Sequence, residues 1–217
     1  MIVSRGRRYI FVHIPKTGGT SLALALESKA MKDDILIGDT PKAKQRRKRL
    51  KGVKSEGRLW KHSRLVDTYG LLTQDDMHAF FVFTLVRNPW DRMVSYYHWL
   101  QDQTFDNQAV TLAQQFDFTG FLNNPIIIES VRNSPYQSYV TDKDGADCCD
   151  LYLRLENIED DVEKLETQLD IRLPAIETVN QSVRDKDWRG YYSEADAALV
   201  GRICAIDVLR LGYQFDP

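Results

Sequence analysis

Seven consecutive residues near the start of the chain combine groups that bind anions: Pro15, Lys16, Thr17, Gly18, Gly19, Thr20 and Ser21. The glycines let a backbone approach a ligand closely, and the lysine ammonium and the hydroxyls add hydrogen-bond donors. Where such a loop opens a helix, its backbone N–H groups and the positive end of the helix dipole also point at the ligand. We therefore predict that residues 15–21 bind an anionic group.

The order of residues in this loop separates it from two common nucleotide-binding motifs. A nucleoside-triphosphate loop reads G-x-x-x-x-G-K-[ST], whereas Lys16 precedes the glycines here. The dinucleotide pattern G-x-G-x-x-G is also absent. An ordinary turn from a strand into a helix is the alternative without function, and the added lysine and hydroxyls disfavour it.

A second candidate is Arg87, which follows a continuous apolar run at residues 80–86. Sheets of α/β proteins bind ligands at the carboxyl ends of their parallel strands. A planar guanidinium binds phosphate in a bidentate manner. Arg87 is therefore a candidate anion ligand, and an ion pair in the core is the alternative role for it.

The elements that must position these residues repeat the order strand, turn, helix. Short β-branched and aromatic runs at residues 9–14, 80–86 and 151–155 predict strands buried on both faces. Helices are predicted to begin near residues 20, 89, 158 and 193, with Asn88 as an N-cap, and the last helix to end at Gly212. This alternation predicts an α/β fold with a central, mainly parallel sheet flanked by helices.

Length and composition favour one globular domain over residues 1–217, because 43% of the residues are hydrophobic and 28% are charged. No apolar run approaches the roughly 20 residues of a transmembrane helix. The basic N-terminus has no long apolar stretch behind it and is not expected to be a signal peptide. Three cysteines exclude a disulfide scaffold, and we expect reduced thiols in a cytoplasmic protein.

The charge of the chain is balanced overall and uneven locally. Residues 41–64 hold eleven lysines or arginines and one acid, a local charge of +10, and since the chain carries −2 in total, the rest carries −12. The balanced total argues against a nucleic-acid partner. The basic segment is either a solvated loop or a local field that attracts an anionic substrate.

Two long segments resemble the carbohydrate sulfotransferases, the membrane-type and bacterial family that includes the heparan and chondroitin enzymes. Residues 13–21 (HIPKTGGTS) are similar to the family's 5′-phosphosulfate loop, and residues 85–97 (LVRNPWDRMVSYY) to its 3′-phosphate motif. Residues 154–157 and 211–215 are similar to its late segments. The resemblance spans nearly the full chain in order.

This resemblance implies a P-loop-like, three-layer domain that uses 3′-phosphoadenosine 5′-phosphosulfate (PAPS) as sulfuryl donor. It implies that residues 15–21 hold the 5′-phosphosulfate and that Arg87 and Ser95 hold the 3′-phosphate. The aromatic and basic segment at residues 184–192 resembles the loop that closes over the nucleotide, where Arg189 would reach the 3′-phosphate. A surface loop held by Trp188 is the alternative for that segment.

Catalysis would need a group that stabilises the leaving phosphate and a base for the acceptor hydroxyl. Lys16 fits the first role. For the base we predict His62, in a stretch where some family members carry a histidine and others a glutamate; Lys61 and Arg64 should lower its pKa and keep the ring neutral. His78, Asp67 and Glu56 are the rival bases.

No metal is expected, because the four histidines form no known ligand spacing and the cysteines Cys148, Cys149 and Cys204 give only a weak pattern. The resemblance alone favours a carbohydrate hydroxyl as the acceptor, and a small phenol or a lipid head group stays open; the basic segment would suit an anionic acceptor. Two other function classes stay open at this point. A P-loop nucleotide kinase would need the triphosphate loop, and a non-catalytic polyanion-binding module would need the loss of Lys16 or of the base.

Overall fold

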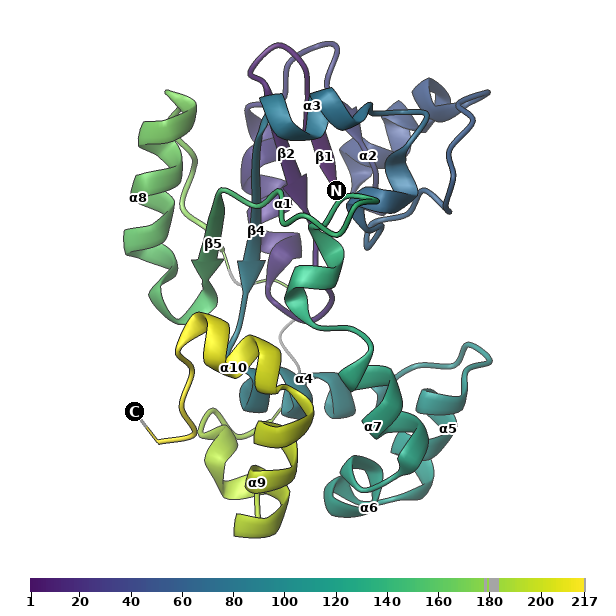
Figure 1. Cartoon of the computed structure of the whole chain (residues 1–217), viewed down its shortest axis with the longest axis vertical. Coiled ribbons are helices and arrows are strands. Elements are labelled where there is room, and N and C mark those ends of the chain that lie inside the picture. Colours follow the sequence, from purple (N-terminus) through teal and green to yellow (C-terminus); the bar gives the residue numbers. More distant parts are fainter. Residues whose placement is uncertain (178, 180–183, 217) are drawn as a thin grey trace. The chain divides into compact units, whose positions relative to one another are not determined.

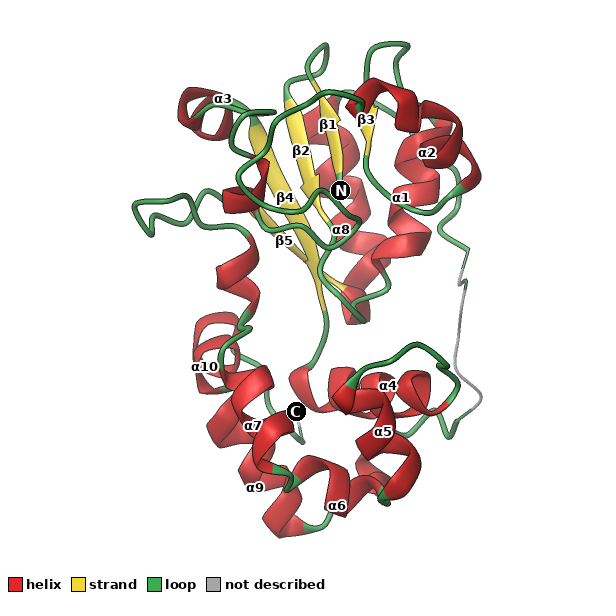
Figure 2. Ribbon diagram, turned by 90° about the vertical axis from the view of Figure 1, so that its right-hand side faces the viewer, coloured by secondary structure: helices red, strands yellow, loops and turns green. Residues whose placement is uncertain are grey.

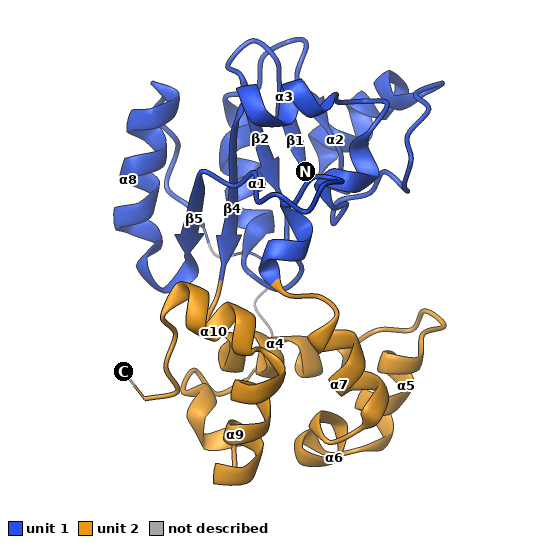
Figure 3. Cartoon of the chain, viewed as in Figure 1, with its two compact units in different colours: residues 1–86, 136–179 blue, residues 87–135, 180–217 orange. Residues whose placement is uncertain are grey.

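The computed structural model describes residues 1–177, 179 and 184–216. The chain falls into two units, coloured separately in Figure 3. Unit 1 consists of residues 1–86 and 136–179, and unit 2 of residues 87–135 and 180–217. The organisation of residues 1–217 as a single domain stays a prediction.

A five-stranded sheet forms the centre of unit 1, in the order β3-β1-β2-β4-β5. The strands are β1 (Ile2–Ser4), β2 (Tyr9–Val12), β3 (Ile35–Leu36), β4 (Phe81–Val86) and β5 (Leu151–Arg154). β2 pairs with β4 and β4 with β5 in parallel, whereas β1 is antiparallel to both β2 and β3. Only β1 therefore runs against the other four strands, and the predicted α/β fold is confirmed with a mixed sheet.

Both faces of this sheet are buried, as the continuous apolar runs predict. One face presents Tyr9, Phe11, Phe83, Leu85 and Leu153, which pack with Leu22 and Leu26 of α1 (Gly19–Ser28) and Leu165 and Leu169 of α8 (Ile158–Leu169). α1 and α8 lie on the same side of the sheet (Figure 2), and α8 runs alongside β5 (Figure 1). Ile10, Val12 and Val82 fill the opposite face and are fully buried.

Short helices and turns make up the rest of unit 1. They are α2 (Pro41–Arg46), α3 (Gln74–Ala79) and the 3-10 helices η1 (Arg47–Leu50), η2 (Leu65–Thr68), η3 (Tyr136–Tyr139) and η4 (Leu155–Asn157). α3 ends two residues before β4 begins, and it lies at the end of the sheet where that strand starts (Figure 1).

The described part of unit 2 is helical. It contains α4 (Pro89–Gln101), α5 (Gln108–Gln115), α6 (Phe118–Leu122), α7 (Pro125–Arg132), the 3-10 helix η5 (Trp188–Tyr191), α9 (Glu194–Ile203) and α10 (Ala205–Leu211). α4 buries Trp90, Met93, Val94 and Tyr97, the stripe that its sequence spacing predicts. Tyr97 meets the rings of Phe118 and Phe121 at 5.4 and 5.2 Å, which packs α6 against α4.

The predicted helix ends hold, with one correction. The Asn88 side chain accepts a hydrogen bond from the Trp90 N–H and caps α4, and Ser193 caps α9 in the same way through the Asp196 N–H. The expected single last helix is two helices, because the backbone leaves helical geometry at Cys204 before α10 ends at Gly212 with a positive φ of 65°. Among the described residues, no helix is long and apolar enough to cross a membrane.

Candidate functional site

The loop that follows β2 has the backbone of an anion-binding turn. Lys16 has a φ of 64°, which is rare outside glycine, and Gly18 has a φ of 82° as the N-cap of α1. The N-cap residue of α1, Gly18, makes no side-chain hydrogen bond to the N–H groups of the first turn. A left-handed lysine costs of order 1–3 kcal/mol and is found where function requires it. Residues 15–19 thus aim a lysine and a helix N-terminus from the carboxyl end of a buried strand.

The two glycines are required by their neighbours as well as by the backbone. A Cβ at Gly18 would lie 2.8 Å from Cδ1 of Leu155, and a Cβ at Gly19 would overlap Cδ2 of His13. Leu155 belongs to one of the late segments noted above, which the fold brings against the loop. Leu155 and His13 therefore pack closely against the two glycines, and a larger residue at either position would displace the loop.

The hydroxyls of the loop have different surroundings. Thr17 is fully buried, and its Oγ1 donates to the Ile14 carbonyl at 2.9 Å, so this hydroxyl holds the turn together. Ser21 Oγ accepts from the Val179 N–H at 3.2 Å. Lys16 and Thr20 are half-buried. The lysine, Thr20 and the backbone of the loop are consequently the parts best placed to meet a ligand.

The structure brings His62 next to this loop. His62 Nδ1 lies 2.8 Å from the His13 carbonyl oxygen, and the two imidazoles meet edge to face with centroids 4.7 Å apart. His13 itself packs on Gly19, so His62 is one side chain away from the start of α1. Because a carbonyl can only accept, Nδ1 must donate its proton, and Nε2 is left with the lone pair. This is the tautomer that a general base requires.

The environment of His62 keeps its ring neutral. Burial lowers the pKa of His62 from 6.5 to about 4, against the opposing effect of the hydrogen bond to His13, and the positive charge of Lys61 lowers it further. We expected Lys61 and Arg64 to be the cause; burial is the larger one, and Arg64 is not among the contributors. His13 is buried and its pKa also lies well below the usual value.

The rival bases lie elsewhere in unit 1. His78 belongs to α3 and its Nε2 lies 2.8 Å from Asp142 Oδ2, at the end of the sheet where β4 begins, whereas the loop follows the carboxyl end of β2. Asp67 Oδ2 accepts from the Arg64 N–H at 2.8 Å and caps η2. His13 is the buried core residue that its position predicts.

In unit 2, Arg87 and Ser95 belong to one polar cluster. Arg87 Nε donates to Asp91 Oδ2 at 2.6 Å, and Arg184 Nη2 donates to Asp91 Oδ1 at 2.6 Å, so the carboxylate holds two guanidinium groups side by side. Ser95 is buried one turn further along α4 on the same helix face as Asp91. The alternative of an ion pair for Arg87 is thus realised.

Two buried atoms of this cluster have no partner among the described residues. They are Nη1 of Arg184, whose side chain is 10% exposed, and Nε2 of His98, which follows Ser95 by one turn of α4. A buried donor left without an acceptor costs about 1–3 kcal/mol. The unpartnered Arg184 N–H group fits an anionic ligand such as a phosphate.

Arg189, predicted to reach the same phosphate, is engaged differently. It pairs with Asp187 at 3.2 Å and with Asp216 at 3.3 Å and lies over the Trp188 ring at 4.6 Å. Trp188 packs edge to face on Phe215 at 5.3 Å, which holds η5 in place. The structure brings Arg184, rather than Arg189, next to Arg87.

The basic segment has both structural and exposed members. Arg46 donates to the Met31 carbonyl at 2.7 Å, Arg49 to that of Asp34 at 2.8 Å and Lys42 to that of Glu27 at 2.5 Å. The exposed remainder comprises Lys44, Arg47, Lys48, Lys51, Lys54 and Arg58. Trp60, 43% exposed, extends this surface to His62, whose ring it meets edge to face at 5.0 Å.

Sequence reasoning missed Arg184, Asp91 and the contact between His13 and His62. Asp91 was visible as the residue four positions after Arg87, the spacing of an ion pair at the start of a helix. Arg184 lies 97 positions after Arg87, and no local pattern connects two such residues.

Comparison with known proteins supports this picture. Residues 1–177 match the model of the sulfotransferase family. A structure of mouse sulfotransferase SULT7A1 complexed with PAP is similar at 13% sequence identity, covering 94% of this chain and 86% of that one with a TM-score of 0.53, which shows a shared fold. A structure of retinol dehydratase with androsterone and inactive cofactor PAP is 14% identical, covers 95% and 82% of the two chains, and reaches a TM-score of only 0.40.

No curated protein matches the chain in a sequence search. The family model, however, covers well over half of the residues, including the loop, His62, Arg87 and Ser95. The chain belongs to the sulfotransferase family.

Proposed function

We propose that the protein transfers the sulfuryl group of PAPS to an acceptor hydroxyl, with Lys16 and His62 as catalytic residues. The observation that carries the proposal is the contact of His62 with His13 and, through it, with Gly19 of the loop. This contact supports His62 as the base, because its imidazole lies beside the loop that we propose for the 5′-phosphosulfate. Family membership supports the type of reaction.

In this proposal the acceptor oxygen attacks sulfur and the bond from sulfur to the 5′-phosphate oxygen breaks. Negative charge then grows on the leaving phosphate, where Lys16 and the N–H groups of residues 18–21 stabilise it. The acceptor proton goes to Nε2 of His62. Thr17 shapes the loop, because its hydroxyl donates to the Ile14 carbonyl.

The 3′-phosphate of the donor is the anion that we propose for the cluster of Arg87, Ser95 and Arg184. The unpartnered Nη1 of Arg184 is the observation that supports it. PAP, 3′-phosphoadenosine 5′-phosphate, is named with the SULT7A1 structure and carries a 3′-phosphate.

We expect the protein to bind PAP well and AMP, which lacks the 3′-phosphate, poorly. Because each hydrogen bond to a charged group contributes about 1.5–3 kcal/mol, Arg87→Ala should weaken PAP binding by about one to two orders of magnitude. AMP binding should change little. Calorimetric titration of both nucleotides into both proteins measures this, and equal affinity of the wild-type protein for PAP and AMP would refute the assignment.

The same titration decides between Arg184 and Arg189. If Arg184 completes the phosphate site, Arg184→Ala should weaken PAP binding as Arg87→Ala does and Arg189→Ala should have a small effect. The reverse order would return the role to Arg189, which would then have to leave Asp187 and Asp216.

For the acceptor we propose an anionic compound, with an acidic carbohydrate as first candidate. The exposed cations of the basic segment would attract it by long-range electrostatics. Trp60 offers a flat apolar surface beside His62 on which a sugar ring could lie.

We therefore expect a variant with Lys44, Arg47, Lys48 and Lys51 replaced by Gln to have a raised KM for an acidic acceptor and a weaker dependence on salt. Arg46 and Arg49 are kept because they hold the loop after α1. The KM for PAPS, measured in the same assay, is the internal control. If only the KM for PAPS rises, the segment belongs to the donor site.

A further inference from the structure

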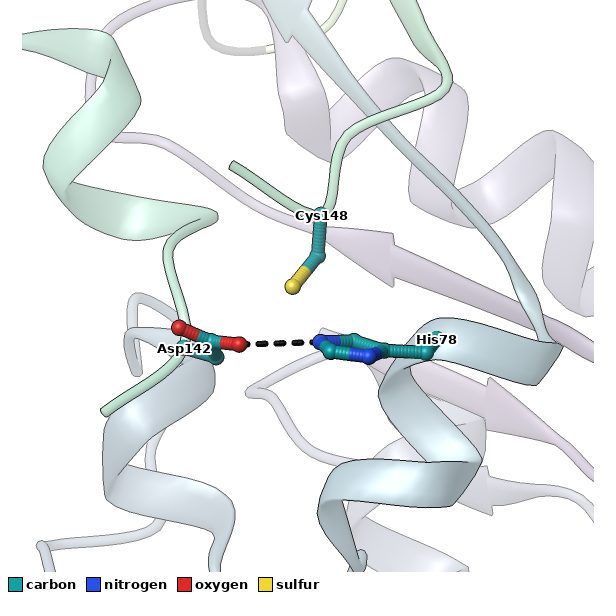
Figure 4. Close-up of side chains that lie close together, drawn as sticks. All are labelled: His78, Asp142 and Cys148. Atoms are coloured by element: carbon teal, nitrogen blue, oxygen red, sulfur yellow. Dashed lines mark hydrogen bonds and ion pairs between the residues drawn. The ribbon is translucent and has the colours of Figure 1, made fainter. Parts of the chain in front are cut away.

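A cluster of three side chains outside the proposed active site combines nitrogen, oxygen and sulfur donors. His78, Asp142 and Cys148 each offer one atom, and these atoms lie within 4.8 Å of one another. Figure 4 shows the Cys148 sulfur facing the point where the His78 imidazole meets the Asp142 carboxylate. We propose that these three residues bind a divalent transition-metal ion, with Zn²⁺ as the first candidate.

The spacing of the three atoms suits one small ion. Zinc bonds of about 2.0–2.3 Å in tetrahedral geometry place neighbouring ligand atoms roughly 3.5 Å apart. His78 Nε2 and Asp142 Oδ2 are at 2.8 Å, and the sulfur lies within 4.8 Å of both. Shifts of about 1 Å in the ligand atoms, through small side-chain rotations, would therefore bring all three within bonding distance of one ion. A fourth position would be left for water.

The backbone holds two of the ligands on opposite sides of one hairpin. The Asp142 N–H donates to the Ala146 carbonyl at 3.0 Å, and the Cys148 N–H donates to the Val140 carbonyl at 2.9 Å. An antiparallel bridge between Thr141 and Asp147 lies between these bonds. Asp142 and Cys148 are thereby fixed on the two strands of the hairpin, one residue beyond the bridged pair on each strand.

Hydrogen bonds also orient the carboxylate. Its Oδ1 accepts from the N–H groups of Asp144 at 3.0 Å and Ala146 at 2.9 Å, and Gln74 Nε2 lies 3.3 Å from Oδ2. The Asp142 side chain is 1% exposed, and Oδ2 is the oxygen that meets His78. Such outer partners are typical of metal ligands. His78, whose side chain is 51% exposed, leaves a route for the ion from solvent.

The chemistry of the donors selects the kind of ion. Thiolate and imidazole favour zinc and related transition ions, whereas Mg²⁺ and Ca²⁺ prefer a shell of oxygens. Binding would replace the Cys148 thiol proton, which passes to solvent, so the affinity should rise with pH. Among the described residues, no other group of three such donors is this close.

The position of the cluster indicates a structural role. His78 lies on α3, just before β4, and the hairpin leads into β5, its parallel neighbour. An ion would tie together the segments that lead into two adjacent strands, β4 and the edge strand β5, at the end of the sheet opposite the loop that follows β2. The proposed sulfuryl transfer would therefore not use this metal. A direct hydrogen bond between His78 and Asp142, with no ion, is the alternative.

The test titrates Zn²⁺, and separately Co²⁺, into chelator-treated protein kept reduced with a phosphine. Wild-type protein should bind one ion, its melting temperature should rise, and Co²⁺ should produce the charge-transfer absorption of a cobalt–thiolate bond. Cys148→Ser and His78→Ala should each weaken binding at least as much as the roughly 10–100-fold caused by loss of an outer partner.

Cys149→Ser is the matched control, because it removes the neighbouring thiol, which is outside the cluster. It should bind the ion as the wild-type protein does. The absence of saturable one-to-one binding by the wild-type protein would overturn the proposal. So would equal binding by Cys148→Ser, or a loss confined to Cys149→Ser. The cobalt spectrum of the wild-type protein reports thiolate coordination without relying on the folding of any variant.

Discussion

Lys16→Met should leave a folded protein whose kcat is lower by about two to three orders of magnitude. The methionine keeps most of the aliphatic stem, which is half-buried, and removes only the ammonium. That charge is needed most when the leaving phosphate gains negative charge, so the loss should appear in kcat more than in the KM for PAPS. Steady-state kinetics at saturating PAPS measure it.

Lys32→Met is the matched control, because Lys32 is exposed and lies in the turn after α1, outside the loop. It should behave as the wild-type protein does. A Lys16→Met variant with normal kcat at saturating donor would remove Lys16 from the mechanism, and a rise in KM alone would reduce its role to ground-state binding.

His62→Ala should lower kcat by about two to four orders of magnitude while PAP affinity is kept. The pH dependence has a defined direction. Because the pKa of His62 lies at about 4, the ring is neutral above that pH, and the rate of the wild-type protein should fall only as the pH drops toward 4. This acidic limb should be missing in His62→Ala. A fall in rate centred near pH 6.5 would contradict the buried environment that we assign to His62.

His62→Asn separates a base from a structural contact. The Asn side-chain amide can donate to the His13 carbonyl as Nδ1 does, yet it has no basic nitrogen in place of Nε2. We expect it to be as inactive as His62→Ala and more stable. A largely active His62→Asn would mean that the contact with His13 matters and that another group takes the proton.

The local parts of the site could be predicted from the sequence because each is a strand followed by a turn and a helix. β2 with residues 15–21, and β4 with Arg87 and the Asn88 cap, are continuous in sequence and follow propensities that tertiary contacts do not override. β1 and β3, of three and two residues, were missed because strands this short show no periodicity.

The contacts between residues far apart in the sequence could not be predicted in the same way. The distance from His62 to His13 depends on how the long connection between α1 and β4 returns to the sheet. Arg184 meets Asp91 across 93 positions, and His78 meets Asp142 across 64. Such contacts follow from packing of whole elements, which a single sequence does not encode as a local signal. In the basic segment, composition alone suggested only a solvated loop or an electrostatic field. It could not indicate that Arg46 and Arg49 donate hydrogen bonds to the backbone of the turn after α1.

The most direct test of the account is a transfer assay with PAPS labelled in its sulfuryl group, run with and without a metal chelator. Acidic glycans, neutral sugars, phenols and lipid head groups serve as acceptors, and released PAP is measured alongside the label. The account predicts that label passes to a hydroxyl acceptor in step with PAP release, best with an acidic glycan, and that Lys16→Met and His62→Asn each slow it by about two orders of magnitude or more. Absence of transfer to every acceptor, in a protein that also fails to bind PAP, would contradict it.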